Sequence, residues 1–371
     1  MRQSTCQPPR RVTRSAAGFT LLEMMISMGL LTLVIGTTLG GMSDIIRANE
    51  VVVATSSLNG SLRTGMDLIV RDMLQVGAGL PSSHSISIPS GNASSPVLLP
   101  GPPGTNFTTA NDATSIPAII ARPGAGPPIN GVATDVVTLL MADNNFLNVG
   151  ITAATATNIE IAPGPDLTAG PDRVTEGQLM MIKKGSFTTL VQVTNVVAAN
   201  RRLIFNNGDS LNLNQSGAQF GNLAALNAAD PANTPSAVVV TRIRMITYYL
   251  DATADPQHPR LVRRINNGDA MTFDNTLGTA VALDMENLLF TWDITNGTNN
   301  PGNVRMVAAD LTTAGACNPV ACAPTAIRKA NIALTGRNRN VRSRTSVPLR
   351  NTLQSQVALR GMAFVDRYRS S

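Results

Sequence analysis

The sequence predicts an α+β protein in which one long N-terminal helix packs on an antiparallel, β-rich globular head. Three observations predict this fold. An apolar run fills residues 19–42, an amphipathic helical pattern continues to residue 76, and short apolar stretches joined by turns follow residue 132. Strands that are joined by turns rather than by helices pair antiparallel. The boundaries that we predict are 1–18 for a basic leader, 19–43 and 44–79 for the two halves of the helix, 80–131 for an irregular segment and 132–371 for the head.

The apolar run is long enough to cross a membrane. Residues 19–42 carry one formal charge, that of Glu23. A helix over this stretch is ~36 Å long at ~1.5 Å per residue, whereas the hydrocarbon core of a bilayer is ~30 Å thick. Positions 1–18 hold four arginines and no acid. Because basic flanks stay on the cytoplasmic side, we expect the N-terminus inside and the residues after 42 outside.

Small residues precede the apolar run. Ala16, Ala17 and Gly18 lie before it, whereas the cleavage site of an ordinary secretory signal lies after its apolar core. Cleavage here removes the arginines and keeps the apolar helix. Glu23 lies just inside the apolar boundary, where a carboxylate is costly and indicates a function. The alternative is that Glu23 lies near enough to the interface to stay hydrated.

These residues resemble a known signature. Gly18, Phe19 and Glu23, in the segment GFTLLE followed by ~20 apolar residues, resemble the cleavage and methylation signature of type IV prepilins and of the pseudopilins of type II secretion. The resemblance implies that prepilin peptidase cuts between Gly18 and Phe19 and that the new Phe19 amine is methylated. It also implies that Glu23 pairs with the N-terminal ammonium of a neighbouring subunit. Pairing offsets part of the cost of burying either charge.

The resemblance implies partners and a location. The partners are prepilin peptidase, other major and minor pilins, an inner-membrane assembly platform, and membrane lipid before assembly. The location is the bacterial inner membrane, with the N-terminus in the cytoplasm and the head in the periplasm, and afterwards a pilus on the cell surface.

Looser patterns in the head resemble the PilW-like minor pilins and the J-type pseudopilin of type II secretion. They lie at residues 71–79, 247–250, 259–264, 288–292 and 357–360. A head of nearly 300 residues crowds its neighbours if it is repeated along a thin fibre, so we expect a minor pilin that acts in initiation or at the tip. The alternatives are a J-type minor pseudopilin and a membrane-anchored surface adhesin or DNA-binding protein.

The second half of the helix is amphipathic. Its apolar residues recur at steps of three and four, which places them on one helix face that packs on the head. Gly60 and Gly65 weaken the helix locally, and Gly77, Gly79 and Pro81 end it. The residues of the apolar face are Leu58, Leu62, Met66, Ile69, Met73 and Val76.

The remaining chain divides into an irregular segment and a series of strands. Ten prolines lie between residues 81 and 131, so we expect only short strands there, at 86–88 and 116–120. Beyond this segment, apolar stretches bounded by turn residues indicate strands. The strands that we predict are 135–141, 178–183, 187–197, 201–205, 237–250, 260–265, 283–293, 304–312 and 326–334.

Composition fits an exported protein. Hydrophobic residues make up 43% of the chain, which is ample for a core, while charged residues make up 14% and aromatic residues 4%. The formal charge of +6 falls to +2 once the four arginines of positions 1–18 are set aside. A general role in binding polyanions gains little from that charge.

Three cysteines occur in the chain. Cys6 lies in the expected leader and is lost on processing. Cys317 and Cys322 flank an Asn-Pro turn on the side of the membrane where disulfides persist, so we expect them to close a small loop. The alternatives are two unpaired thiols or, with less support because no histidine lies near, a metal site.

The chain shows no catalytic set, and we expect neither an enzyme nor a cofactor or metal. His84 and His258 are expected in exposed loops, and no phosphate loop, zinc spacing or nucleophile elbow occurs. Residues 327–371 carry ten basic residues and one acid. A solvated face and a contact with acidic subunits are two explanations. A third is a patch that binds nucleic acid or another anion, with Arg337, Arg339, Arg342 and Arg344 as its candidates.

Overall fold

The computed structural model describes residues 18–88, 96–102, 107–109, 113–185, 187–215, 238–253, 255–266, 279–295, 299–342 and 348–363. The chain divides into two compact units, Met1–Ala54 and Thr55–Ser371. Helix α1 (Leu21–Gln75) begins in the first unit and ends in the second. Every strand that the structure describes belongs to the second unit, which confirms the predicted α+β class of a helix followed by antiparallel sheets.

The last turns of α1 bury the predicted apolar face. Leu58, Leu62, Met66, Ile69 and Met73 are all buried in the largest core cluster of the second unit. They face apolar residues of both sheets, so the helix packs through the side chains that its periodicity indicates. This confirms the predicted amphipathic half of the helix.

Glycines end α1 where the sequence predicts. Gly77 and Gly79 have φ angles of +77° and +70°, which glycine adopts without a Cβ penalty. The Gly77 N–H donates to the Leu140 carbonyl at 3.0 Å, which joins the end of the helix to the sheet. The helix itself runs unbroken through Gly60 and Gly65.

Gly65 has a packing role. A Cβ atom at this position would lie 3.0 Å from Leu261 Cδ2, 3.1 Å from Ala282 Cβ and 3.3 Å from Leu334 Cδ2. No room exists for a side chain without movement of these neighbours. Gly65 therefore lets the helix lie close to the strands, whereas the surroundings of Gly60 are open.

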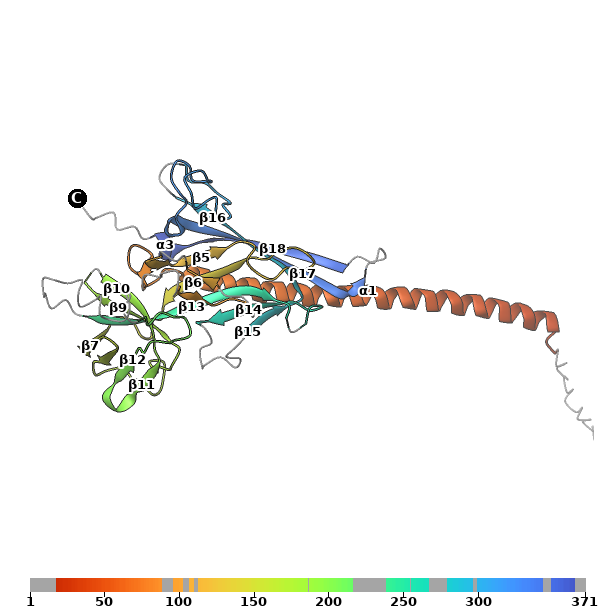
Figure 1. Ribbon diagram of the computed structural model, residues 1–371. Coiled ribbons are helices and arrows are strands. Elements are labelled where there is room, and N and C mark those ends of the chain that lie inside the picture. The colour runs from red at the N-terminus through yellow and green to blue at the C-terminus, as the bar shows by residue number, and fades with distance from the viewer. Residues whose placement is uncertain are drawn as a thin grey trace, which may run out of the picture. The chain divides into compact units, whose positions relative to one another are not determined.

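Strand β13 (Val239–Asp251) is the centre of the larger sheet, which has 11 strands in the described part of the chain. It pairs antiparallel with β6, β7, β9 and β14 (Figure 1). The predicted strand 237–250 is thus the one on which the sheet is built. The other strands of this sheet are β5 (Ile119–Arg122), β6 (Val136–Ala142), β7 (Val149–Ala154), β8 (Asn158–Ile161), β9 (Leu179–Lys184), β10 (Phe187–Gln192), β11 (Asn195–Val197), β12 (Arg202–Ile204), β14 (Arg260–Ile265) and β15 (Thr279–Leu283).

A second, three-stranded sheet has the order β16-β17-β18 and is also antiparallel. Its strands are β16 (Met285–Ile294), β17 (Ile327–Arg342) and β18 (Pro348–Ala358). Its inner face places Leu288, Phe290, Trp292 and Leu334 in the core cluster that α1 also enters. The two sheets therefore share one core with the end of the helix.

The remaining elements are short. β1 pairs with β4, and β2 pairs with β3, each antiparallel. These strands cross the proline-rich segment, as expected there. The bounds are β1 (Ser85–Ser87), β2 (Leu98–Leu99), β3 (Phe107–Thr108), β4 (Ser115–Pro117), the 3-10 helices η1 (Ala198–Asn200) and η2 (Pro324–Ala326), and helix α3 (Arg360–Ala363).

A buried polar cluster also fastens α1 to the larger sheet. The Tyr248 hydroxyl donates to Asp72 Oδ2 at 2.6 Å, and Arg263 Nε donates to the same oxygen at 2.7 Å. Tyr248 and Arg263 are paired opposite each other on β13 and β14. Because a buried carboxylate is costly unless it is paired, these bonds favour one position of the helix on the sheet.

The predicted strand 304–312 is wrong beyond its first residue. Val304 forms a two-way bridge with Trp292, but Met306 has a positive φ of 61°, which ends the extended run. Asp310 then accepts hydrogen bonds from the N–H groups of Val307 and Ala316 and makes a turn. A carboxylate that captures nearby N–H groups competes with a strand ladder.

Candidate processing and assembly site

The start of α1 is a reciprocal capping box. Thr20 N–H and Thr20 Oγ1 each donate to Glu23 Oε2 at 3.0 Å, and Glu23 N–H donates to Thr20 Oγ1 at 3.2 Å. A Thr at the N-cap and a Glu three residues later satisfy two N–H groups that the helix leaves unpaired. Gly18 and Phe19 precede this box, so the residues of the expected cleavage site lie in the non-helical chain just before the helix.

This capping box has a signal in the sequence that charge and hydropathy alone do not reveal. Thr20 and Glu23 have the T-x-x-E spacing that begins an apolar helix. Charge alone marks Glu23 only as an acid in an apolar setting. Its carboxylate is also a cap that sets where the helix starts.

The first unit exposes an apolar helix surface. Its large apolar side chains, from Leu21 to Val53, are exposed on every side of the helix. α1 is long and apolar enough to cross a membrane. A soluble monomer rarely exposes an apolar surface of this extent, so this half of the helix requires lipid or other apolar helices around it.

The comparisons with known proteins bear on this segment. Residues 13–39 match the family model described as the prokaryotic N-terminal methylation motif. No curated protein and no solved structure matches the chain.

The motif and the fold together define a class. A methylation motif on an exposed apolar helix, followed by an antiparallel β-rich region, fits a pilin-like subunit that is anchored in the inner membrane before it assembles. The motif supports a type IV pilin or pseudopilin, which prepilin peptidase processes and which assembles with other pilins.

A disulfide joins Cys317 and Cys322, whose Cα atoms are 5.1 Å apart. Both cysteines are buried in the shared core cluster. The Cys322 N–H donates to the Asp310 carbonyl at 2.9 Å, which holds the closed loop against the preceding turn. The disulfide therefore orders a segment that has no regular secondary structure.

One of the four candidate arginines of the basic patch, Arg337, has a structural partner. Arg337 is buried, and its guanidinium lies 3.3 Å from Glu286 Oε1, so Arg337 is a structural ion-pair partner. Arg350 Nε donates to Oε2 of the same glutamate at 2.6 Å. The side chains of Arg339 and Arg342 and the whole of Arg344 lie outside the described residues, and for them the patch stays a prediction.

The two histidines differ from each other. His84 is buried, with a positive φ of 52°, so the expectation of an exposed loop residue is wrong for it. The chain there folds back, because Ala118 N–H donates to the His84 carbonyl at 2.8 Å. His258 is partly exposed, and its Nδ1 lies 2.6 Å from Asp284 Oδ1. Within the described ranges, no group of three or more His, Cys, Asp and Glu side chains is placed to hold a metal ion.

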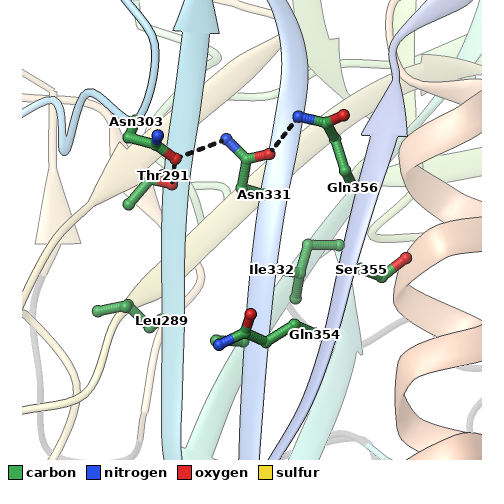
Figure 2. Close-up of a pocket in the computed structure, with 9 residues that line it drawn as sticks. Leu289, Thr291, Asn303, Asn331, Ile332, Gln354, Ser355 and Gln356 are labelled. Carbon is green, nitrogen blue, oxygen red and sulfur yellow. Dashed lines mark hydrogen bonds between the residues drawn. The ribbon is translucent and has the colours of Figure 1, made fainter.

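The outer face of the three-stranded sheet carries a cavity of about 440 Å³ lined by amide and hydroxyl groups. Figure 2 shows Asn303, Asn331 and Gln356 in a row across it. Gln356 Nε2 donates to Asn331 Oδ1 at 2.8 Å, and Asn331 Nδ2 donates to Asn303 Oδ1 at 3.2 Å. Leu289 and Ile332 form its apolar part. The lining is polar and open to a hydrogen-bonding ligand, and the Asp293 carboxylate accepts from Asn331 Nδ2 at 2.9 Å beside it.

Proposed function

We propose that the chain is a minor subunit of a type IV pilus that acts in pilus initiation or at the pilus tip. The observation that carries the proposal is the match of residues 13–39 to the prokaryotic N-terminal methylation motif. The exposed apolar helix that follows the motif supports it, because such a helix fits both a bilayer and a helix bundle. The role is structural and not enzymatic.

Processing is the first step of the proposed mechanism. Prepilin peptidase cuts between Gly18 and Phe19, and the Phe19 amine is methylated. The basic leader stays in the cytoplasm and the head lies in the periplasm, as the arginines of positions 1–18 favour. The cut leaves the Thr20–Glu23 capping box intact, so the mature helix keeps its cap.

Assembly is the second step, and Glu23 guides it. Glu23 Oε2 accepts the hydrogen bonds from Thr20, whereas Oε1 accepts none from the described residues. A neighbouring subunit's Phe19 ammonium can therefore pair with Oε1 while the capping box persists. A paired carboxylate costs far less to bury than an isolated one, so the pairing favours transfer of the helix from lipid into a bundle.

The size of the head supports a minor role. The second unit, Thr55–Ser371, contains the 11-stranded and the three-stranded sheet and most of the chain. Repeated at every position of a thin fibre, such heads exclude one another sterically. A subunit at the tip or in the initiating complex avoids that conflict.

Mass spectrometry of sheared, purified filaments tests the proposal. We expect head peptides at low abundance together with an N-terminal peptide that begins at methylated Phe19. Glu23→Ala is expected to abolish incorporation, whereas Asp44→Ala, which removes another exposed acid of the same helix, keeps it. Normal incorporation of Glu23→Ala contradicts the proposed pairing.

Two other functions give different results. A J-type pseudopilin shares the motif, and its deletion abolishes protein secretion but leaves piliation intact. An adhesin anchored by an uncleaved helix retains Arg14 in the mature chain, which N-terminal sequencing detects. The amide-lined cavity of the three-stranded sheet favours a binding role of the head, and an adhesive tip pilin combines both functions.

A further inference from the structure

A second cavity, of about 170 Å³, lies beside β13 on the larger sheet. Arg242 and Arg244 come from β13 itself, while Asp143 follows β6 and Asn266 follows β14. Gln178, just before β9, and Arg173, in the loop between β8 and β9, complete the polar lining. The sheet thus brings residues from distant parts of the sequence to one place.

The charges of this lining do not balance. Three arginines face one carboxylate, that of Asp143, which leaves two positive charges in excess. Arg242 Nε donates to Asp143 Oδ2 at 2.9 Å, and its other nitrogens donate to the carbonyls of Arg173 and Pro171, each at 2.7 Å. All three guanidinium nitrogens of Arg242 therefore donate hydrogen bonds, and they hold the loop at residues 171–173 beside the sheet.

Both carboxylate oxygens of Asp143 also accept hydrogen bonds. Its Oδ2 accepts from both Arg242 and Arg244, and its Oδ1 accepts from Asn145 N–H at 3.1 Å. Burial raises the pKa of Asp143, but the Asn145 N–H and the two guanidiniums outweigh burial and hold the pKa below its ordinary value. The carboxylate stays ionised and compensates only one of the cations.

Two guanidiniums keep donors for a ligand. The Arg244 side chain is 44% exposed, and one of its nitrogens donates to Asp143 at 2.8 Å. Its remaining N–H groups bond no other residue of the described ranges. Arg173 is exposed and makes no ion pair within those ranges. Both side chains can therefore donate to a group that enters the cavity.

Two buried amides line the cavity, and they offer different groups to a ligand. Asn266 Oδ1 accepts from Met245 N–H at 3.0 Å, which fixes the amide so that Nδ2 is left without a partner among the described residues. Gln178 is buried as well, and its Oε1, an acceptor, has no hydrogen-bond partner among the described residues. Buried polar groups are normally hydrogen-bonded, so Gln178 Oε1 lacks a donor, which a hydroxyl of an acidic sugar or of a protonated phosphate can supply. Asn266 Nδ2 is the amide group that can donate to the oxyanion itself.

We propose that this cavity binds one small oxyanion, a carboxylate or a phosphate, between the guanidiniums of Arg173 and Arg244 and above the Asn266 amide. The planar guanidinium fork matches both kinds of oxyanion. The volume of the cavity is below the roughly 300 Å³ of a site for a drug-sized ligand, so the occupant is a single small anionic group and not a polymer segment. An acidic sugar supplies such a carboxylate, and free inorganic phosphate supplies the other anion.

Isothermal titration of the full-length protein in detergent micelles tests the site. The probes are glucuronate, inorganic phosphate and, as the neutral control, methyl glucoside. We expect saturable 1:1 binding of glucuronate or phosphate at low ionic strength and none of methyl glucoside. Arg173→Ala and Arg244→Ala are each expected to weaken that binding about tenfold, as loss of a charge-assisted bond does. Arg71→Ala, which removes another exposed arginine, leaves it unchanged.

Three results overturn the proposal. They are no saturable binding of either anion, equal affinity of the double Arg173→Ala, Arg244→Ala variant and the wild type, and an equal loss in Arg71→Ala. Fluorescence of Trp292, the chain's one tryptophan and a buried one, verifies that each variant is folded. The site is independent of the filament role, since Arg244→Ala is expected to enter filaments normally whether or not the anion binds.

Discussion

Asp72 and Tyr248 are 176 positions apart in the sequence, and the Tyr248 hydroxyl donates to Asp72 Oδ2 at 2.6 Å. Arg263 completes the cluster. We expect Asp72→Ala to lower the free energy of unfolding by about 3 kcal/mol, because it leaves the Arg263 guanidinium without its partner. Tyr248→Phe, which removes one hydroxyl, is expected to cost about 1 kcal/mol. Denaturant titrations followed by Trp292 fluorescence measure the free energy of unfolding of both variants. Equal losses in the two variants contradict the role of Asp72 as the partner of Arg263.

The same cluster predicts a dependence on alkaline pH. Burial and the Asp72 carboxylate raise the pKa of Tyr248 well above its ordinary value of 10.0. Near pH 10 the unfolded chain releases the tyrosine proton, whereas the folded chain keeps it. The contribution of Tyr248 to the free energy of unfolding is therefore fully present well below pH 10 and is lost as the pH rises through and beyond 10. The difference in unfolding free energy between wild type and Tyr248→Phe is expected to shrink between about pH 9 and about pH 11. A difference that stays constant over this range contradicts the prediction.

The two glycines of the amphipathic half of α1 are expected to respond oppositely to substitution. Gly60→Ala stabilises the protein by ~0.5–1 kcal/mol, since its surroundings are open and Ala favours a helix. Gly65→Val destabilises it by ~1–3 kcal/mol, because the new side chain collides with Leu261 and Ala282. Thermal unfolding measures both effects. A neutral Gly65→Val shows that the helix does not lie as close to the sheet as described.

The Cys317–Cys322 disulfide closes a short loop, so its expected contribution is modest. The double variant Cys317→Ala, Cys322→Ala is expected to lower the free energy of unfolding by about 2 kcal/mol, the loop-closure value for a ring of this size. Dithiothreitol lowers the wild type to the same level and leaves the double variant unchanged. If dithiothreitol also lowers the stability of the double variant, then its effect on the wild type does not come from this disulfide.

Arg337 and Arg350 bind the same glutamate but differ in exposure. The Arg337 side chain is 8% exposed and the Arg350 side chain 48%. We expect Arg337→Ala to lower the free energy of unfolding by about 3 kcal/mol, as loss of a buried ion-pair partner does. Arg350→Ala costs ~0–1 kcal/mol, because solvent screens an exposed pair. Urea titrations compare the two, and a larger loss for Arg350→Ala contradicts the burial of Arg337.

Periodicity predicted the long elements of the fold well. The buried face from Leu58 to Met73 followed from steps of three and four, and the strand 260–265 agrees with β14 at both ends. Such patterns are reliable because burial itself imposes the period. Glu23 was singled out by its charge in an apolar run and not by periodicity, and its role in pairing stays a prediction.

Other features depend on tertiary contacts that no local pattern reports. The sequence does not predict β18, because polar residues such as Arg350 and Gln356 dominate the segment. Only one residue of the strand is buried, so the apolar alternation that marks a strand is weak. Arg337 was assigned to a basic patch because its partner, Glu286, lies on a neighbouring strand. The cavity lined by Arg173, Arg242 and Arg244 has no local sequence signal for the same reason, since its residues meet only once β13 is in place.

The pairing of β6 with β13 has a consequence for the newly made chain. Thr138 and Thr247 lie on these two strands and hydrogen bond at 2.9 Å, yet they are 109 positions apart. At ~5–20 residues per second, the ribosome releases β13 roughly 5–20 s after β6. During that interval β6 has only β5 as a partner, with Ile119 opposite Leu139 and Ala121 opposite Val137, and its other edge is unpaired and open to aggregation. The larger sheet therefore closes only after β13 has been synthesised, and this sets the earliest time at which the head can fold.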